Sequence, residues 1–116
     1  MFGLTVRWPL HAAPDGVAEQ LRSYVRTASL PRFTGMPGLH EKVWTMREGT
    51  FFAGTYLWRT AEDRTAFLTE FQSKPSPVTE MVGAGPSVEE FEIVAVAEGA
   101  EGIAALPSLG TAHQAA

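Results

Sequence analysis

A β-hairpin rich in aromatic residues stands at the centre of the sequence. Residues 39–47 alternate as a strand does, Glu48 and Gly49 supply turn chemistry, and residues 50–59 are dense in aromatic and β-branched side chains. The second arm carries apolar side chains on both faces, and so does the strand predicted at 88–97. A sheet built from these strands must therefore be covered on both faces.

The remaining elements are predicted from the periodicity of apolar residues and from capping, proline and glycine residues at their ends. Residues 2–8 alternate in the manner of a strand, Pro14 precedes apolar residues at helical spacing, and Thr60 with Asp63 approximates a capping box. Pro and Gly residues predict a connecting loop over 30–38. The predicted elements are a strand at 2–8, a helix at 14–29, strands at 39–47 and 50–59, a helix from 61 ending before Pro75, a short helical turn at 78–82 and a strand at 88–97.

This order of elements is the split βαβ arrangement of the ferredoxin-like fold, βαββαβ, in the α+β class. A four-stranded antiparallel sheet would carry both helices on one face. The other face, of roughly 400–500 Å², lies at the upper end of what a soluble monomer leaves exposed. Because a two-fold dimer uses one patch twice, we expect a homodimer that pairs sheet on sheet.

Length and composition limit the classes of function. The chain of 116 residues, 45% apolar and without cysteine, is expected to form a single domain over 1–97 followed by a flexible tail over 98–116. Its nine basic residues are scattered, which argues against nucleic acid as a partner. Apolar runs too short to span a membrane and the lack of a secretory signal profile predict a cytoplasmic protein without a membrane partner.

The loop and the hairpin carry a recognisable set of residues: Phe33, Met36-Pro37-Gly38-Leu39, Lys42, Trp44, Gly54 and Tyr56-Leu57-Trp58. Together with the element order, this set resembles the antibiotic biosynthesis monooxygenase superfamily, especially its YdhR-like branch of small monooxygenases, over about residues 2–97. The resemblance implies a dimeric α/β barrel with a small-molecule site between sheet and helices. It also implies chemistry on polycyclic or phenolic substrates without a metal or flavin cofactor.

Two departures from that family bear on the chemistry. Its quinone-forming members use an asparagine beside a tryptophan, and this sequence contains no asparagine, which favours a cyclase or isomerase as the alternative reaction. Haem-degrading relatives bind iron through a histidine on the second helix, and residues 61–72 contain no histidine. We therefore expect neither haem nor a metal ion.

His40 and Lys42 are the candidate catalytic residues. Strand alternation predicts that they share one face with Trp44 and Met46, which would place a base and a cation between apolar walls. In this hypothesis His40 removes a proton, and Lys42 or Arg7 stabilises the resulting anion. The alternative is that His40 and Lys42 are ordinary half-exposed strand residues.

The candidate substrate-binding residues are Arg7, His11, Phe33, Met36, Trp44, Tyr56, Trp58 and Phe67. The hairpin register decides which of them face one another. A turn of one or three residues sets Lys42 opposite Tyr56 and His40 opposite Trp58, whereas a turn of two sets Glu41 opposite Tyr56. Phe33 and Met36 could form a lid, and Arg7 with Arg59 could orient an anionic oxygen, although core packing and surface charge are the common uses of such residues.

These observations predict a cofactor-free enzyme, a monooxygenase acting on an aromatic or polyketide-like hydrophobic small molecule in secondary metabolism. The alternatives are a cofactor-free cyclase or isomerase that uses the same pocket, and a module that binds a small molecule without turning it over. A further alternative is that no pocket of roughly 300 Å³ exists.

Overall fold

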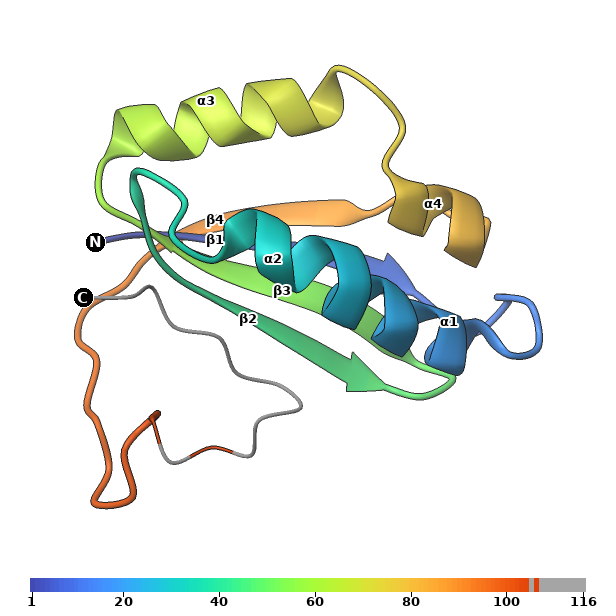
Figure 1. Ribbon diagram of the computed structural model, residues 1–116. Helices are drawn as coiled ribbons and strands as arrows, with labels where there is room; N and C mark the ends of the chain where they lie inside the picture. Colours follow the sequence, from blue (N-terminus) through green and yellow to red (C-terminus); the bar gives the residue numbers. More distant parts are fainter. Residues whose placement is uncertain (105, 107–116) are drawn as a thin grey trace.

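The computed structural model describes residues 1–104 and 106 (Figure 1). The elements in chain order are β1 (Phe2–Pro9), α1 (Val17–Tyr24), the π-helix η1 (Val25–Ser29), α2 (Leu30–Phe33), β2 (Leu39–Arg47), β3 (Phe51–Trp58), α3 (Ala61–Gln72), α4 (Pro77–Val82) and β4 (Ser87–Glu92). The strands form a four-stranded antiparallel sheet in the order β2-β3-β1-β4. The predicted α+β, ferredoxin-like fold is confirmed.

The helices pack on one face of the sheet. Leu4, Val6 and Trp8 of β1 point toward them and are buried, together with Tyr56 and Trp58 of the neighbouring β3. The Trp8 indole Nε1 donates a hydrogen bond to Thr79 Oγ1 of α4 over 2.9 Å, which ties the short helix to the central strand. Figure 1 shows the helical layer on this face of the sheet, and the core lies between the two layers.

The first helical segment is longer and less regular than its sequence predicts. The prediction of a loop over 30–38 is wrong for residues 30–33, which continue the helix as α2. The π-helix η1 lies between α1 and α2, and the Leu30 amide there donates a hydrogen bond to the Val25 carbonyl, five residues earlier. Pro31 explains this widening: in a regular α-helix its ring would clash with the Thr27 carbonyl, and it has no N–H to donate.

The second helix begins and ends as its sequence predicts. Thr60 caps α3, because its side-chain oxygen accepts a hydrogen bond from the Asp63 amide over 3.0 Å. Ser76 caps α4 in the same way, accepting from the Thr79 amide. Gly83 ends α4 in the left-handed conformation, with φ of 78°, which glycine adopts without steric cost.

The last strand is shorter than predicted. We expected it to reach residue 97, but β4 ends at Glu92, and Val94 and Val96 are 85% and 60% exposed. The pairing of β4 with β1 runs to Glu92 opposite Phe2, and the Ile93 amide still donates a hydrogen bond to the Met1 carbonyl over 2.8 Å.

The face opposite the helices is a mixed surface rather than a continuous apolar one. The hydroxyls of Thr5 and Thr55 hydrogen-bond at its centre over 3.0 Å. Phe91 lies over Gly3, where a Cβ atom would come within 2.2 Å of the ring, so the glycine is required there. Val43 is 45% exposed on the same face. Polar and apolar residues therefore alternate across a surface that this chain leaves largely uncovered.

The chain leaves the sheet after β4 close to its own N-terminus (Figure 1). Residues 98–101, at the start of the predicted tail, are exposed; residues 105 and 107–116 of the tail lie outside the described residues. In the described part of the chain, every helix is too short or too polar to cross a membrane.

Candidate functional site

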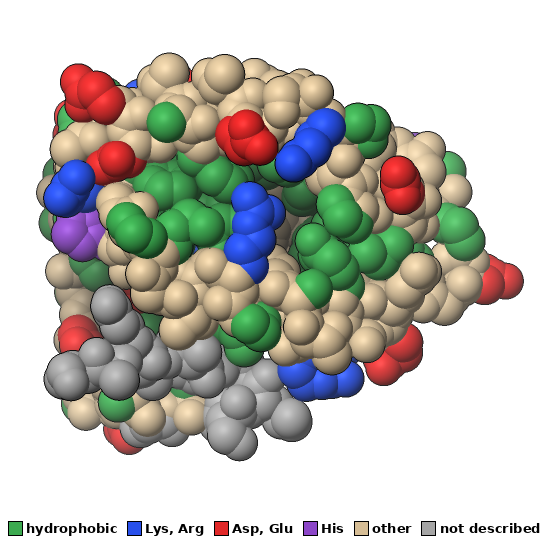
Figure 2. All heavy atoms as spheres, turned by 45° about the horizontal axis from the view of Figure 1, so that its top comes forward, with side chains coloured by type: hydrophobic (Ala, Val, Ile, Leu, Met, Phe, Trp, Pro, Cys, Tyr) green, Lys and Arg blue, Asp and Glu red, His purple; other side chains and the backbone are tan. Residues whose placement is uncertain are grey.

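A cavity of about 90 Å³ opens between the sheet and the helices. Eight aromatic side chains line it: Trp8, Tyr24, Phe33, Trp44, Phe52, Tyr56, Phe67 and Phe71. Its charged lining residues are Arg32, Lys42, Glu70 and Lys74. Figure 2 shows hydrophobic side chains gathered in this recess between the helices, with a basic side chain lying across it.

The Lys42 amino group lies among three aromatic rings. Its Nζ atom is 3.6 Å from the ring centre of Phe33, 4.4 Å from that of Tyr56 and 4.6 Å from that of Trp44. The residue as a whole is half-buried, but this terminal group is enclosed. Among the described residues, none of the carboxylates lies within ion-pair distance of it.

Gly54 makes room for the Lys42 side chain. The two residues are close neighbours on adjacent strands, since Gly54 pairs with Trp44 and Lys42 pairs with Tyr56. A Cβ atom at Gly54 would stand 2.9 Å from Lys42 Cε and 3.5 Å from the Tyr56 hydroxyl oxygen. The missing side chain therefore lets the lysine stem and the tyrosine hydroxyl approach the same point in the cavity wall.

Burial controls the protonation of this amine. Burial, and to a smaller extent the positive charge of Arg32, lowers the pKa of Lys42 from 10.5 to about 6. The three ring faces oppose this shift, because each favours the ammonium form by up to about 2 kcal/mol when desolvated. With a pKa of about 6, the Lys42 side chain is mostly a neutral amine at pH 7 and can accept a proton.

Tyr56 presents the opposite chemistry beside it. Burial raises the pKa of the Tyr56 hydroxyl above its usual value of 10, with Arg32 opposing the shift. The phenol therefore stays protonated and can donate a hydrogen bond. Its ring stacks on Trp58 with a centroid distance of 5.8 Å and packs on Phe67 at 4.8 Å, so its position is fixed.

The π-helix positions the far wall of the cavity. Ser29, at its end, is buried and accepts a hydrogen bond from Trp44 Nε1 over 3.0 Å. Four residues later, Phe33 packs edge-on against both Trp44 and Tyr56, with centroid distances of 6.1 and 5.7 Å. The irregular turn imposed by Pro31 therefore holds two of the three rings around Lys42.

Flexible charged side chains stand at the rim. Arg32 is exposed and lies over the outer face of Phe33, with its guanidinium carbon 4.8 Å from the ring centre. Lys74 follows α3 and pairs with Glu70 over 3.4 Å, with both side chains mostly exposed. Exposed pairs of this kind are weak, so the rim can rearrange at little cost in free energy.

Five of the predicted site residues meet in this cavity: Lys42, Phe33, Trp44, Tyr56 and Phe67. The turn between Arg47 and Phe51 contains three residues, and Lys42 pairs with Tyr56. This is one of the two registers that the sequence left open. The functional roles of these residues remain predictions.

The predicted placement of His40 is wrong. A β-bulge between Leu39 and Glu41 leaves His40 without a partner, and Leu39 takes the place opposite Trp58 that we expected His40 to occupy. The imidazole is exposed and lines no part of the cavity. The alternation of side chains along β2 cannot be extended across the bulge. His40, the base that we expected in the cavity wall, is therefore not part of that wall.

Four other predicted binding residues lie away from the cavity wall. Arg7 is exposed on the opposite sheet face, with its guanidinium carbon 4.3 Å from the ring centre of Phe51, and His11 is exposed in the turn after β1. Met36 packs against the core, and Trp58 lies buried behind Tyr56. Arg59, the second candidate for orienting an anion, is exposed and pairs with Asp63.

Several residues of the site were not predicted. Arg32 reaches the cavity because helix continues through Pro31, where the sequence pattern predicts a loop. Ser29 lies at the end of the predicted helix, but its contact with the Trp44 indole was not predicted. Gly54 also belongs to the cavity wall. Its position within an aromatic strand is a recognisable signal of close approach by another group.

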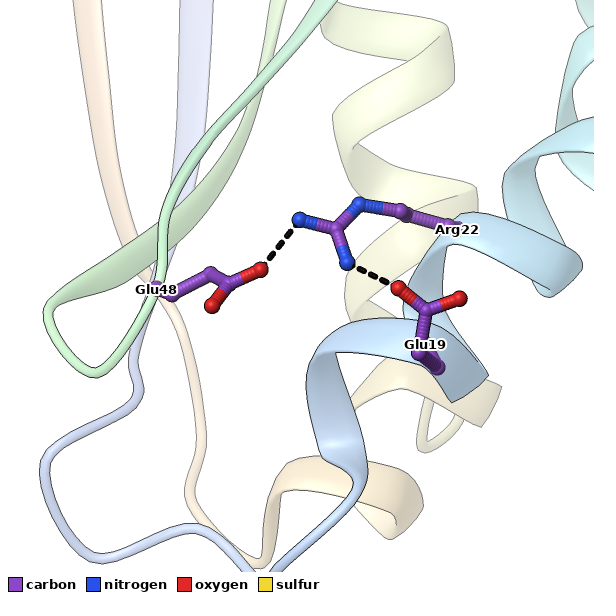
Figure 3. Close-up of polar contacts among 3 residues, drawn as sticks. All are labelled: Glu19, Arg22 and Glu48. Carbon is purple, nitrogen blue, oxygen red and sulfur yellow. Dashed lines mark hydrogen bonds and ion pairs between the residues drawn. The ribbon is translucent and has the colours of Figure 1, made fainter.

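The most extensive ion-pair cluster of the described residues lies outside the cavity. Arg22 of α1 pairs with Glu19 on its own helix and with Glu48 in the β2–β3 turn (Figure 3). The hydrogen bonds that Arg22 donates to Glu48 and, to a smaller extent, to Glu19 raise its pKa. The cluster links the helix to the hairpin end and offers no reactive group. Nowhere in the described residues do three or more His, Asp or Glu side chains gather to hold a metal ion.

Comparisons with known proteins establish the fold. No protein-family model matches the chain, and no curated protein matches it significantly. Among solved structures, the NE2512 protein of unknown function from Nitrosomonas europaea is similar with a TM-score of 0.64 and 17% identity, over 85% of this chain and 94% of that one. The R26S mutant of MhuD, with two manganese protoporphyrin IX molecules bound per active site, has a TM-score of 0.55 and 17% identity, over 84% and 99%.

The buried amine predicts a specific dependence of stability on pH. Between about pH 6 and 10 the unfolded chain binds a proton at Lys42 that the folded chain does not, so the free energy of unfolding should rise with pH by up to about 1.4 kcal/mol per unit. Urea unfolding at pH 7, 8 and 9 measures this. The Lys42→Met variant should lack this part of the rise and be more stable than the wild type at pH 7. Parallel pH profiles of the two proteins would contradict the burial of the amine.

Proposed function

We propose that this protein is a cytoplasmic, cofactor-independent enzyme that uses Lys42 as a general base on an aromatic or polyketide-like small molecule. The observation that supports it is an amine enclosed by three aromatic rings in the cavity wall, without a carboxylate partner among the described residues, a setting that lowers the pKa of the amine. Lys42 thereby takes the role of base that the sequence suggested for His40. We place the protein in the antibiotic biosynthesis monooxygenase superfamily, in its YdhR-like branch.

The chemistry begins with proton transfer. Lys42 removes a proton from a phenol or from an acidic carbon, and the ammonium that forms lies on the faces of three rings, next to the anion it has created. The Tyr56 hydroxyl, held close to the same point, can donate a hydrogen bond to the developing oxyanion. Neither step requires a bound cofactor.

Molecular oxygen would then serve as the oxidant. In a monooxygenation, the carbanion of an activated methylene is oxidised to a carbonyl. One oxygen atom of O₂ enters the product and the other leaves as water, so no external reductant is needed. The apolar wall would exclude bulk water from the reactive anion.

The similar structure of MhuD supports a small-molecule site on this fold. That protein accommodates two planar macrocycles in one active site. In this chain the cavity of about 90 Å³ is smaller than the roughly 300–1,000 Å³ of typical ligand pockets, so an aromatic substrate must displace the rim. Arg32 and Lys74 are exposed and can move, and they would then pair with an anionic substituent on the substrate.

A cyclase or isomerase is the second candidate. The sequence contains no asparagine, the residue that works beside tryptophan in quinone-forming members of the superfamily. The same base could initiate a ring closure or a double-bond migration without oxygen. Consumption of O₂ during turnover separates the two reactions, and binding without turnover would identify a non-catalytic module.

We also propose that the protein forms a homodimer through the sheet face opposite the helices. Val43 is 45% exposed on that face, and Phe91 and Leu57 are half-buried there. Pairing two copies would cover these side chains and form the dimeric α/β barrel that the resemblance implies. The hydroxyl pair of Thr5 and Thr55 would lie near the centre of that interface.

A panel of polycyclic phenols tests the enzymatic proposal. With a substrate that the wild type turns over, Lys42→Met should lower kcat by about 100-fold or more, the usual contribution of a general base. In the wild type kcat/KM should rise through about pH 6, because only the neutral amine accepts a proton. Substrate consumption and O₂ uptake are the readouts.

His40→Ala provides the matched control, because it removes an ionisable side chain of the same strand from outside the cavity. Its turnover should equal that of the wild type. Loss of activity in His40→Ala together with full activity in Lys42→Met would reject Lys42 as the base.

The dimer is tested by a charge on the exposed sheet face. Val43→Glu should shift the mass in light scattering from two copies to one, because the dimer would bury an unpaired carboxylate. Val94→Glu, on the exposed chain after β4, serves as a control and should remain dimeric. A wild type that is monomeric at micromolar concentration would contradict the proposal.

A further inference from the structure

The chain contains two lysines, and both line the same cavity in different surroundings. Lys42 Nζ is enclosed by Phe33, Tyr56 and Trp44. The Lys74 side chain is 71% exposed and pairs with Glu70. One amine is thus enclosed and unpaired among the described residues, whereas the other is exposed and paired with a carboxylate.

We propose that Lys42 is also a nucleophile that forms an imine with an aldehyde or ketone entering this cavity. This inference rests on the proposed function, because it uses the same cavity. It adds that the ligand carries a carbonyl group. It stands on the enclosure of the amine, on the space left by Gly54 and on the tyrosine hydroxyl at the same point.

The reaction balances without any further reactant. The amine nitrogen attacks the carbonyl carbon, which forms a C–N bond and a carbinolamine. The carbonyl oxygen then leaves as water, carrying the two hydrogens of the amine, and a C=N bond remains. Oxidation states are unchanged, so neither oxidant nor reductant is required.

The surroundings of Lys42 suit each stage of this reaction. Only a neutral amine attacks, and a lysine desolvated in an apolar site next to another cation is the recognised way to obtain one, here with Arg32 as that cation. The protonated Tyr56 hydroxyl lies where it can donate a hydrogen bond to the carbonyl oxygen and to the departing oxygen. The rings exclude water, which would otherwise hydrolyse the imine.

The other titratable or charged groups facing the cavity do not compete for the amine. Tyr24 and Arg32 approach from the first helical segment, and Glu70 and Lys74 approach from the end of α3. Glu70 is paired with Lys74 instead. The volume of about 90 Å³ favours a small apolar aldehyde or methyl ketone, or the carbonyl end of a longer molecule that extends past the rim.

Reductive trapping tests the inference on the intact protein. The full chain is incubated at pH 7 with butanal and cyanoborohydride, which adds hydride to the imine carbon and leaves a stable secondary amine. Peptide mass spectrometry then measures alkylation at Lys42, at Lys74 and at the Met1 α-amine separately. Lys42 should be alkylated about 100-fold faster than Lys74, since a much larger share of it is neutral at this pH.

Two controls show that the fold causes the difference. In urea-unfolded protein the alkylation ratio of the two lysines should fall to about one. In the native protein, lowering the pH from 7 to 5 should slow alkylation of Lys42 by about tenfold, because the neutral fraction falls below the pKa. Equal alkylation of Lys42 and Lys74 in the native protein would overturn the inference.

This result is separable from the fate of the proposed function. If Lys42→Met loses turnover of the phenols but Lys42 is not trapped, the residue acts as a base and the imine is rejected. If Lys42 is trapped selectively while Lys42→Met retains turnover, the imine stands and the proposed base is rejected.

Discussion

The site depends on a buried amine that has no carboxylate to neutralise it among the described residues. A lysine that stays neutral at pH 7 costs the folded state roughly 5 kcal/mol relative to an ordinary lysine, since its proton must be given up well below its usual pKa. A methionine of similar length would fill the same space without that cost. Retaining lysine there is therefore better explained by chemistry than by packing, which is the general pattern of perturbed groups in clefts.

Backbone irregularities on two elements build the surroundings of this amine. Pro31 widens the helix into a π turn, which brings Ser29 to the Trp44 indole and Phe33 over the lysine. On the sheet, Gly54 leaves open the space that the lysine stem occupies. Both features weaken regular secondary structure locally, and both shape the part of the cavity wall that surrounds the Lys42 amine.

Much of the fold could be predicted because it depends on local signals. The Glu48-Gly49 turn, the Thr60 cap and the alternation of β1 each act within a few residues, and the structure contains each of them. The limits of β4 could not be predicted in this way. Residues 93–97 have the composition of a strand, but a strand also needs a partner, and the register of β1 with β4 ends at Phe2 opposite Glu92.

The site was predictable only in part, because local patterns place some of its residues and irregularities of the backbone place the others. Lys42, Trp44 and Tyr56 follow from alternation along a regular hairpin. His40 does not, because a bulge between Leu39 and Glu41, where β2 begins, interrupts the alternation. Arg32 required knowledge that the helix passes through a proline, which local propensity argues against.

The protonation state of Lys42 is the claim on which the chemistry depends, and the two lysines of the chain make it directly measurable. Selective isotope labelling of lysine gives two side-chain NMR signals, which the Lys42→Met variant assigns. The account predicts that the Lys42 signal titrates near pH 6. If both signals titrate together above pH 10, the amine is a solvated ammonium, and neither the base nor the nucleophile exists.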